Sequence, residues 1–253
     1  MNIRAVFVFA MSLIGTLFAQ EFWESKQMTS WSEKETKQLL EDSPWTKKFS
    51  FSQVVILEIG RNADAYDRDS NKELWYRAQF WSARPLREAR VRSMQIQSKY
   101  DQLKPKDKAA FDEKAKGFIE TPFSDIVIVR ITYGSSVVEF ERKMAHYWSS
   151  QTMDLQKNKM FLVVEGKRIP ILSLQQSPSG SNEFYMIFPR QIDGEPVLSK
   201  SYSKVGIEFQ HPEITGFNSG TGTTSAPVSQ DTAQRVWLEF KPQNMTYHGQ
   251  LVF

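Results

Sequence analysis

The chain has 253 residues, a formal charge of +3 at pH 7 and no cysteine. That length allows one large domain or two small ones. Hydrophobic residues make up 40% and charged residues 24%, which is ordinary for a globular protein and argues against wholesale disorder. The lack of cysteine excludes disulfides, thiolate-bound metals and cysteine nucleophiles. Three histidines, His146, His211 and His248, are few for a metalloenzyme, and we predict no cofactor.

The first 19 residues have the pattern of a secretory signal peptide. A short basic start ends at Arg4, and residues 5–19 form an apolar run shorter than the ~20 residues of a membrane span. The segment Leu17–Ala19 is an acceptable cleavage site, although Leu17 is larger than the residue preferred there. An N-terminal anchor that is not cleaved is the alternative. No cysteine follows the apolar run, which excludes a lipid-modified start.

Cleavage after Ala19 removes Arg4 and lowers the charge to +2, so the net charge gives little information about partners. No other stretch approaches membrane-spanning length. We therefore predict an exported protein, periplasmic or extracellular, with no transmembrane helix in the mature chain. Because an exported protein seldom meets nucleic acid, we predict no nucleic-acid partner.

Residues 20–49 are predicted to form an N-terminal helical arm, rich in aromatic and charged side chains. Both Ser30 and Ser32 are followed three residues later by a glutamate, so either serine fits a capping box. The helix should end just before Pro44, because the residue that precedes a proline is biased away from the helical conformation. Its apolar face is narrow, and it therefore needs a surface on which to lie.

Residues 50–150 are predicted to form an α/β subdomain. The stretch 73–82 alternates apolar and polar side chains, which favours a strand, although a helix also fits. Pro85 and Pro105 each fit the first turn of a helix. The expected elements, in chain order, are strands at 49–60 and 73–82, helices at 85–100 and 105–118, a strand at 124–133 and a helix capped by Ser136 that runs to 148.

Residues 151–253 are predicted to form a β-rich subdomain. Residues 216–233 are rich in glycine, serine and threonine and indicate a loop. The expected strands are at 159–165 and 168–174, which form a hairpin around Gly166, and at 183–188, 203–210, 235–241 and 247–253. Six short strands in about 100 residues are typical of a β-sandwich of immunoglobulin-like size.

The predicted fold is therefore α+β. An N-terminal helical arm leads into a small mixed sheet with three or four helices, and a C-terminal half that resembles a β-sandwich follows.

One acidic stretch has the spacing of a calcium site. Asp67, Asp69 and Asn71 alternate in a way that lets three side chains converge on one ion. The rest of the EF-hand pattern is missing, because Lys72 stands where the glycine belongs and Ala78 where the bidentate glutamate belongs. A solvated loop between two strands is the alternative interpretation.

The helix predicted at 85–100 is strongly basic at its beginning. Arg84, Arg87 and Arg90 could present a cationic face to phosphate groups, nucleic acid or anionic lipid. An exposed face that is balanced by acidic residues elsewhere is the alternative.

Two tryptophans lie on the polar side of the strand predicted at 73–82. Exposed indoles on a sheet can stack on sugar rings, so Trp75 and Trp81 are candidate binding residues. They are core residues instead if a helix covers that side of the sheet.

No coherent catalytic set is found in the sequence. Ser201 and Lys204 match the S-x-x-K pattern of serine acyl enzymes, but they lie at the entry of a predicted strand and lack the companion motifs. We interpret this match as chance.

Two segments resemble a group of small exported bacterial proteins. The first contains W-S-E-K-E from Trp31 and L-L-E-D-S-P-W from Leu39, and the second is S-A-R-P-L-R-E-A from Ser82. The resemblance covers about the N-terminal half of the chain. It implies a bacterial, exported protein and transfers no catalytic or binding residue.

These observations predict a non-enzymatic binding or assembly module of the bacterial cell envelope, whose partner is an envelope protein or polysaccharide. The alternative is a hydrolase that acts on cell-wall or carbohydrate material through carboxylates that the sequence does not identify.

Overall fold

The computed structural model describes residues 21–54, 71–177, 181–214 and 235–253. It confirms an α+β fold, built on two antiparallel sheets with helices beside them. The predicted signal peptide at 1–19, the predicted loop at 216–233 and the calcium candidates Asp67 and Asp69 lie outside the described residues.

The N-terminal arm consists of α1 (Phe22–Ser25), the 3-10 turn η1 (Met28–Ser30) and α2 (Glu33–Glu41). Of the two possible capping boxes, the one at Ser32 forms: the Glu35 amide donates to Ser32 Oγ at 3.2 Å, and the Ser32 amide donates to Glu35 Oε2 at 2.8 Å. Hydrogen bonds from Lys26 and Ser32 lower the pKa of Glu35 to about 2. The arm therefore contains more helical segments than the single predicted helix.

The arm is fixed to the body by buried tryptophans. The side chains of Trp31 and Trp45 are completely buried. Trp45 Nε1 donates to the Val252 carbonyl at 2.8 Å, which joins the arm to the C-terminal end of the chain. On α2 itself, Leu39 is completely buried and Leu40 packs against the core, so the narrow apolar face of this helix is covered by the rest of the protein.

The larger sheet is antiparallel and has five strands. In spatial order they are β1 (Thr46–Val54), β2 (Asn71–Phe80), β3 (Ile126–Ser135), β7 (Glu183–Pro189) and β6 (Ser173–Gln176). The strand interpretation of residues 73–82 is confirmed, because alternate side chains of β2 are completely buried. These inward side chains are Leu74, Tyr76, Ala78 and Phe80.

The smaller sheet is also antiparallel and has four strands. In spatial order they are β11 (Arg235–Phe240), β10 (Val205–Gln210), β4 (Phe161–Val164) and β5 (Lys167–Pro170). The predicted hairpin joins β4 to β5, and Glu165 and Gly166 at its turn both have positive φ, as a type I′ turn requires.

The two sheets pack with their inner faces together. Ring centroids of Tyr76 and Phe209 are 5.0 Å apart, and those of Phe80 and Phe240 are 4.8 Å apart. A polar group lies within this aromatic core: Trp148 Nε1 donates to the Tyr76 hydroxyl, which lies 2.9 Å from His211 Nδ1. Burial lowers the pKa of His211 to about 4, so the ring is neutral at pH 7, and its Nδ1 can accept a hydrogen bond from the Tyr76 hydroxyl.

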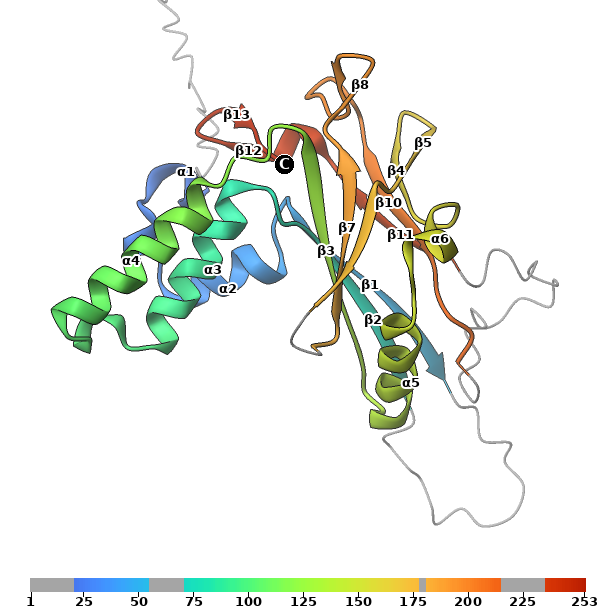
Figure 1. The fold of residues 1–253 in the computed structure, drawn as a ribbon, viewed down its shortest axis with the longest axis horizontal. Coiled ribbons are helices and arrows are strands. Elements are labelled where there is room, and N and C mark those ends of the chain that lie inside the picture. The colour runs from blue at the N-terminus through green and yellow to red at the C-terminus, as the bar shows by residue number, and fades with distance from the viewer. Residues whose placement is uncertain (1–20, 55–70, 178–180, 215–234) are drawn as a thin grey trace, which may run out of the picture.

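Four further helices complete the fold: α3 (Arg84–Gln97), α4 (Pro105–Glu120), α5 (Val138–Ser149) and α6 (Met153–Gln156). Figure 1 shows α1 to α4 gathered on one side of the larger sheet, with the smaller sheet, α5 and α6 on the other side. The predicted capping box at Ser136 does not form. The N-cap of α5 is Val137, and Ser136 Oγ instead accepts a hydrogen bond from the Glu73 amide.

The predicted sandwich of residues 151–253 is not confirmed. Strands β6 and β7 belong to the larger sheet, in which β7 pairs with β3 from Ile126↔Pro189 to Thr132↔Glu183. The larger sheet therefore continues across the predicted boundary at residue 150, and both sheets are open. Counting strands could not reveal this, because pairing depends on register between segments that are far apart in sequence.

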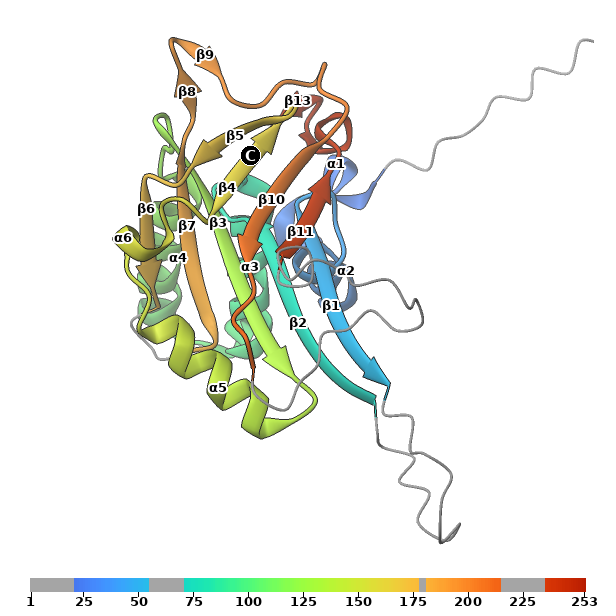
Figure 2. The ribbon, with the colours of Figure 1, turned by 90° about the vertical axis from the view of Figure 1, so that its right-hand side faces the viewer.

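Short elements occupy the remaining described residues. These are η2 (Tyr100–Gln102), η3 (Pro242–Asn244) and the small hairpins β8–β9 (Gln191–Ile192, Glu195–Pro196) and β12–β13 (Thr246–Tyr247, Gln250–Leu251). Figure 2 shows β8–β9 projecting from the end of the molecule and β12–β13 beside α1. Within the described ranges, no helix is long and apolar enough to cross a membrane.

Candidate binding surface on the five-stranded sheet

The outer face of the larger sheet is the side that points away from the smaller sheet. Because successive side chains along a strand point to opposite faces, the residues between the buried core residues point to this outer face. In Figure 1 the helices α2 to α4 stand beside the end of the sheet where β2 ends, and no helix of the described residues covers the half where β2 begins. The residues on this uncovered half, which we call the open face, are Lys48, Ser50, Glu73, Trp75, Arg77, Thr132 and Gly134.

Trp75 lies flat across the neighbouring strand at Gly134. The two residues are directly paired between β2 and β3. A Cβ placed on Gly134 would come within 2.6 Å of Trp75 Cζ2, so the indole rests against bare backbone. Any side chain at position 134 would displace it. The half-buried indole is thus fixed in place as a platform on the sheet.

Two cations flank this indole. Lys48 Nζ and the Arg77 guanidinium carbon each lie 5.6 Å from the centre of a Trp75 ring, which is cation–π range. Lys48 also pairs with Glu73 at 2.9 Å, and Ser50 Oγ donates to the same carboxylate at 2.7 Å. These two hydrogen bonds lower the pKa of Glu73.

Arg77 differs from Lys48 because no carboxylate faces it among the described residues. Its cross-strand neighbour is Thr132. Arg77 Nε and Thr132 Oγ1 are both buried and have no hydrogen-bond partner in the described part of the chain. A donor and a hydroxyl are thus side by side with unused hydrogen-bonding capacity, next to an aromatic platform.

The other half of the outer face is occupied by internal contacts. Gln79 Nε2 donates to the Leu40 carbonyl of α2 at 2.6 Å, and Arg130 Nη1 donates to Gln79 Oε1 at 2.8 Å. Arg130 also forms an ion pair with Glu183. Burial raises the pKa of Glu183, but the hydrogen bond and charge of Arg130 outweigh it, and the pKa is lowered. This half joins the sheet to the arm.

The structure separates the two tryptophans that the sequence proposed together. Trp81 packs against Phe118 of α4, with ring centroids 6.0 Å apart, and the Arg130 guanidinium lies 5.1 Å from its ring. Trp81 therefore anchors a helix. Trp75 lies on the open face and keeps the role of a candidate binding residue.

The predicted cationic face of α3 is divided among different tasks. Arg84 Nε pairs with Glu88 at 2.7 Å. Arg87 is buried, and its Nη1 donates to the carbonyls of Phe118 at 3.1 Å and Thr121 at 2.9 Å, so it ties α3 to the end of α4. Burial and the charge of Arg84 lower the pKa of Arg87. Of the three predicted arginines, Arg90 is simply exposed.

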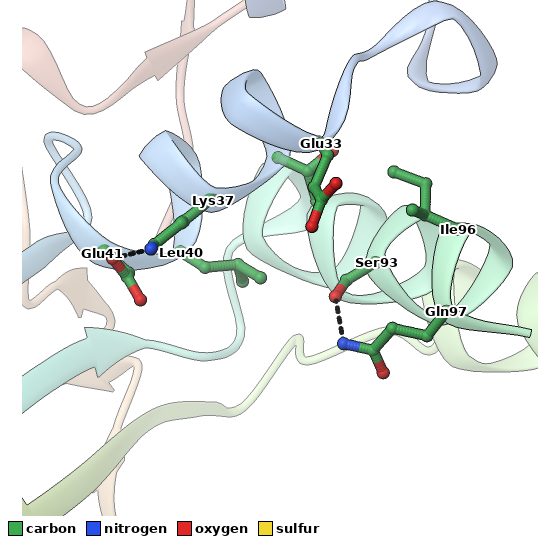
Figure 3. A pocket seen from close by; sticks show the side chains of 8 residues that line it. Glu33, Lys37, Leu40, Glu41, Ser93, Ile96 and Gln97 are labelled. Atoms are coloured by element: carbon green, nitrogen blue, oxygen red, sulfur yellow. Dashed lines mark hydrogen bonds and ion pairs between the residues drawn. The ribbon is translucent and has the colours of Figure 1, made fainter.

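Two of the hollows near the helices gather charged side chains. One, of about 220 Å³, lies between α2 and α3. Figure 3 shows two pairs among its polar side chains, Lys37 with Glu41 and Gln97 with Ser93. Lys37 and Glu41 therefore compensate each other, and Glu33 is left as a single carboxylate with no ion pair among the described residues.

The other hollow, of about 280 Å³, brings Glu24 and Glu88 to one wall beside Tyr247 and His248. Both oxygens of Glu88 are engaged, one by Arg84 and one by the Tyr247 hydroxyl at 2.5 Å. Burial and Glu88 raise the pKa of Tyr247 well above its ordinary range. Glu88 therefore links α3 to the C-terminal hairpin β12–β13 through its hydrogen bond with Tyr247.

No metal site is found in the described residues, because nowhere in them do three or more histidine or acidic side chains converge. Of the three calcium candidates, only Asn71 falls within the description, as the first residue of β2.

Comparisons with protein-family models, curated proteins and solved structures yield no match for this chain.

Sequence reasoning found Trp75 but missed Arg77, Thr132 and Gly134. The strand alternation already placed Arg77 on the same side as Trp75. Thr132 and Gly134 could be recognised only once the register between β2 and β3 was known.

Proposed function

We propose that this protein is an exported, non-enzymatic binding or assembly module of the bacterial cell envelope, which holds an envelope polysaccharide or protein on the open face. One observation carries the proposal: an indole fixed against Gly134 lies beside an arginine that has no carboxylate partner among the described residues. Aromatic and arginine side chains dominate the energetics of binding surfaces. Export is supported by the signal-peptide pattern of residues 1–19.

The proposal is tested by pull-down of isolated envelope material with purified protein. We expect the wild type to retain envelope material and Trp75→Ala to lose it. Trp237→Ala serves as the matched control, because Trp237 lies in the same way against Gly206 on the other sheet. Equal retention by Trp75→Ala and the wild type, with both proteins folded, would refute the proposal.

The second candidate function is a hydrolase that acts on cell-wall or carbohydrate material. It is favoured by one observation, the placement of Glu24 and Glu88 on one hollow, where Glu24 Oε1 is buried without a hydrogen-bond partner. Incubation of the protein with cell-wall material and a panel of glycosides tests it. Turnover that Glu24→Gln abolishes, while Trp75→Ala leaves it intact, would establish the hydrolase and reject the binding module.

A further inference from the structure

We infer that the ligand of the open face is an acidic polysaccharide, in which a sugar ring stacks on Trp75 and a carboxylate group of the sugar pairs with Arg77. This inference rests on the proposed function and names its ligand class.

The first requirement of such a ligand is a flat apolar platform. Trp75 supplies it, because close contact with Gly134 holds the indole down against β3. Pyranose rings expose flat faces of C–H groups, which pack on aromatic rings with little loss of conformational entropy when the ring is already fixed. A peptide could use the same platform, so the charge beside it has to decide between the two.

The second requirement is a cation that is still free to pair. The Arg77 guanidinium carbon lies 5.6 Å from the centre of a Trp75 ring, and the side chain has no carboxylate partner in the described part of the chain. A carboxylate attached to a sugar ring stacked on the indole would therefore come within reach of the guanidinium, which binds planar carboxylates in a bidentate manner.

The third requirement is overall charge complementarity. Among the described residues, the charged groups on and beside the open face are Lys48, Glu73, Arg77 and the neighbouring Arg130 and Glu183. Lys48 compensates Glu73 at 2.9 Å and Arg130 pairs with Glu183, which leaves the charge of Arg77 in excess. A polymer with a regularly repeated negative charge therefore fits this surface better than a neutral or cationic chain.

The test uses polygalacturonate as the acidic probe, with its methyl-esterified form as the neutral counterpart, and measures affinity by titration calorimetry. We expect the wild type to bind polygalacturonate at least about tenfold more tightly than the esterified polymer, and the affinity to fall as salt is added. Arg77→Gln should lose about tenfold or more toward the acidic probe only, because it removes one charge-assisted pair. Trp75→Ala should weaken binding to both probes.

Matched controls come from the other sheet. Trp237→Ala and Arg235→Gln should bind polygalacturonate as the wild type does, and circular dichroism verifies that every variant is folded. Equal affinity of Arg77→Gln and the wild type, or equal affinity for the two polymers, would overturn the acidic ligand. If retention of envelope material still requires Trp75 in that case, the proposed binding function of the open face remains supported and only the proposed ligand class is wrong. Preferential binding of poly-glutamate over polygalacturonate would overturn the saccharide in favour of an acidic peptide.

Discussion

The outer faces of the two sheets share one packing arrangement but differ in the charged residues beside it. On each face a tryptophan lies over a glycine of the neighbouring strand, Trp75 over Gly134 and Trp237 over Gly206. On the smaller sheet, Glu208 stands beside Trp237 and is held by two arginines, Arg168 at 3.0 Å and Arg235 at 3.5 Å. On the larger sheet, the corresponding arginine faces a threonine.

This difference separates a structural use of tryptophan from a recognition use. An aromatic ring over a glycine protects exposed backbone and fixes register in both sheets. Only the open face adds an arginine whose hydrogen bonds are unused by the described residues. The Trp–Gly pair alone therefore does not indicate a binding site. The indication is a neighbouring arginine that is not paired with a carboxylate.

The two sheets share one core, and acidification should destabilise it. We expect this to be the largest of the predicted effects on the free energy of unfolding. The pKa of His211 is about 4 in the folded protein, below its ordinary value of 6.5. The unfolded chain therefore takes up this proton first, so the contribution of His211 is complete above pH 6.5 and is lost progressively as the pH falls to about 4. The loss is of the order of 3 kcal/mol.

Urea unfolding between pH 4 and pH 7 measures this dependence, with His211→Gln as the control that lacks the titrating group. An unchanged pH slope in His211→Gln would show that other groups cause it. If both faces depend on the core alone, acid should weaken any binding only as far as it unfolds the protein.

The Trp–Gly pair is common to both sheets, and replacing the glycine by a larger residue tests what the pair does in each. Gly134→Val and Gly206→Val each force an indole off the sheet, because a Cβ at these positions meets ring atoms at 2.6 Å and 2.0 Å. Each variant should lose about 2 kcal/mol of stability, as overpacked sites do. Only Gly134→Val should also lose retention of envelope material. Thermal melting and pull-down measure the two effects, and equal binding losses would show that the faces are not functionally different.

The two outer faces differ in whether a carboxylate pairs with the arginine beside the tryptophan, and exchanging this feature between the sheets tests its role in binding. Thr132→Glu places a carboxylate opposite Arg77 and imitates the arrangement at Glu208. Because position 132 also lies directly opposite Glu183 on β7, repulsion between the two carboxylates offsets the new ion pair, and stability should change by less than about 1 kcal/mol in either direction. Binding of the acidic probe should be abolished. A Thr132→Glu variant that binds polygalacturonate as well as the wild type would show that Arg77 is not the anion-binding group.

The reverse exchange is Glu208→Gln, which leaves Arg168 and Arg235 without their shared carboxylate. Because Glu208 is buried while both arginines reach solvent, we expect a loss of about 1–2 kcal/mol, measured by urea unfolding. If a tryptophan beside an unpaired arginine suffices for recognition, this variant should gain weak affinity for polygalacturonate on the smaller sheet.

The smallest effect is expected at the compensated pair of the open face. Lys48→Ala removes the ion pair with Glu73, whose partners are both partly exposed, and should change stability by no more than about 0.5 kcal/mol. Affinity for the acidic probe should fall much less than in Arg77→Gln. A larger loss in Lys48→Ala would move the anion-binding role from Arg77 to Lys48.

Local sequence patterns predicted the elements well. The alternation from Leu74 to Phe80 predicted β2, Pro85 and Pro105 marked the starts of α3 and α4, and Gly166 marked the β4–β5 turn. These features depend on interactions between residues close together in the chain, so the sequence contains them directly. The cap of α5 failed for the opposite reason, because Ser136 pairs with Glu73, a residue far away in sequence.

For the candidate site, the sequence by itself determined that Trp75 and Arg77 lie on one side of a strand, and it indicated export. Only the tertiary structure decided which of the predicted binding residues remain available. Arg87 and Trp81 became internal ties to α4, whereas Trp75 came to lie on Gly134. The physical reason is that side-chain availability depends on which strands and helices are neighbours, and that is set by register and packing across more than 50 residues of chain.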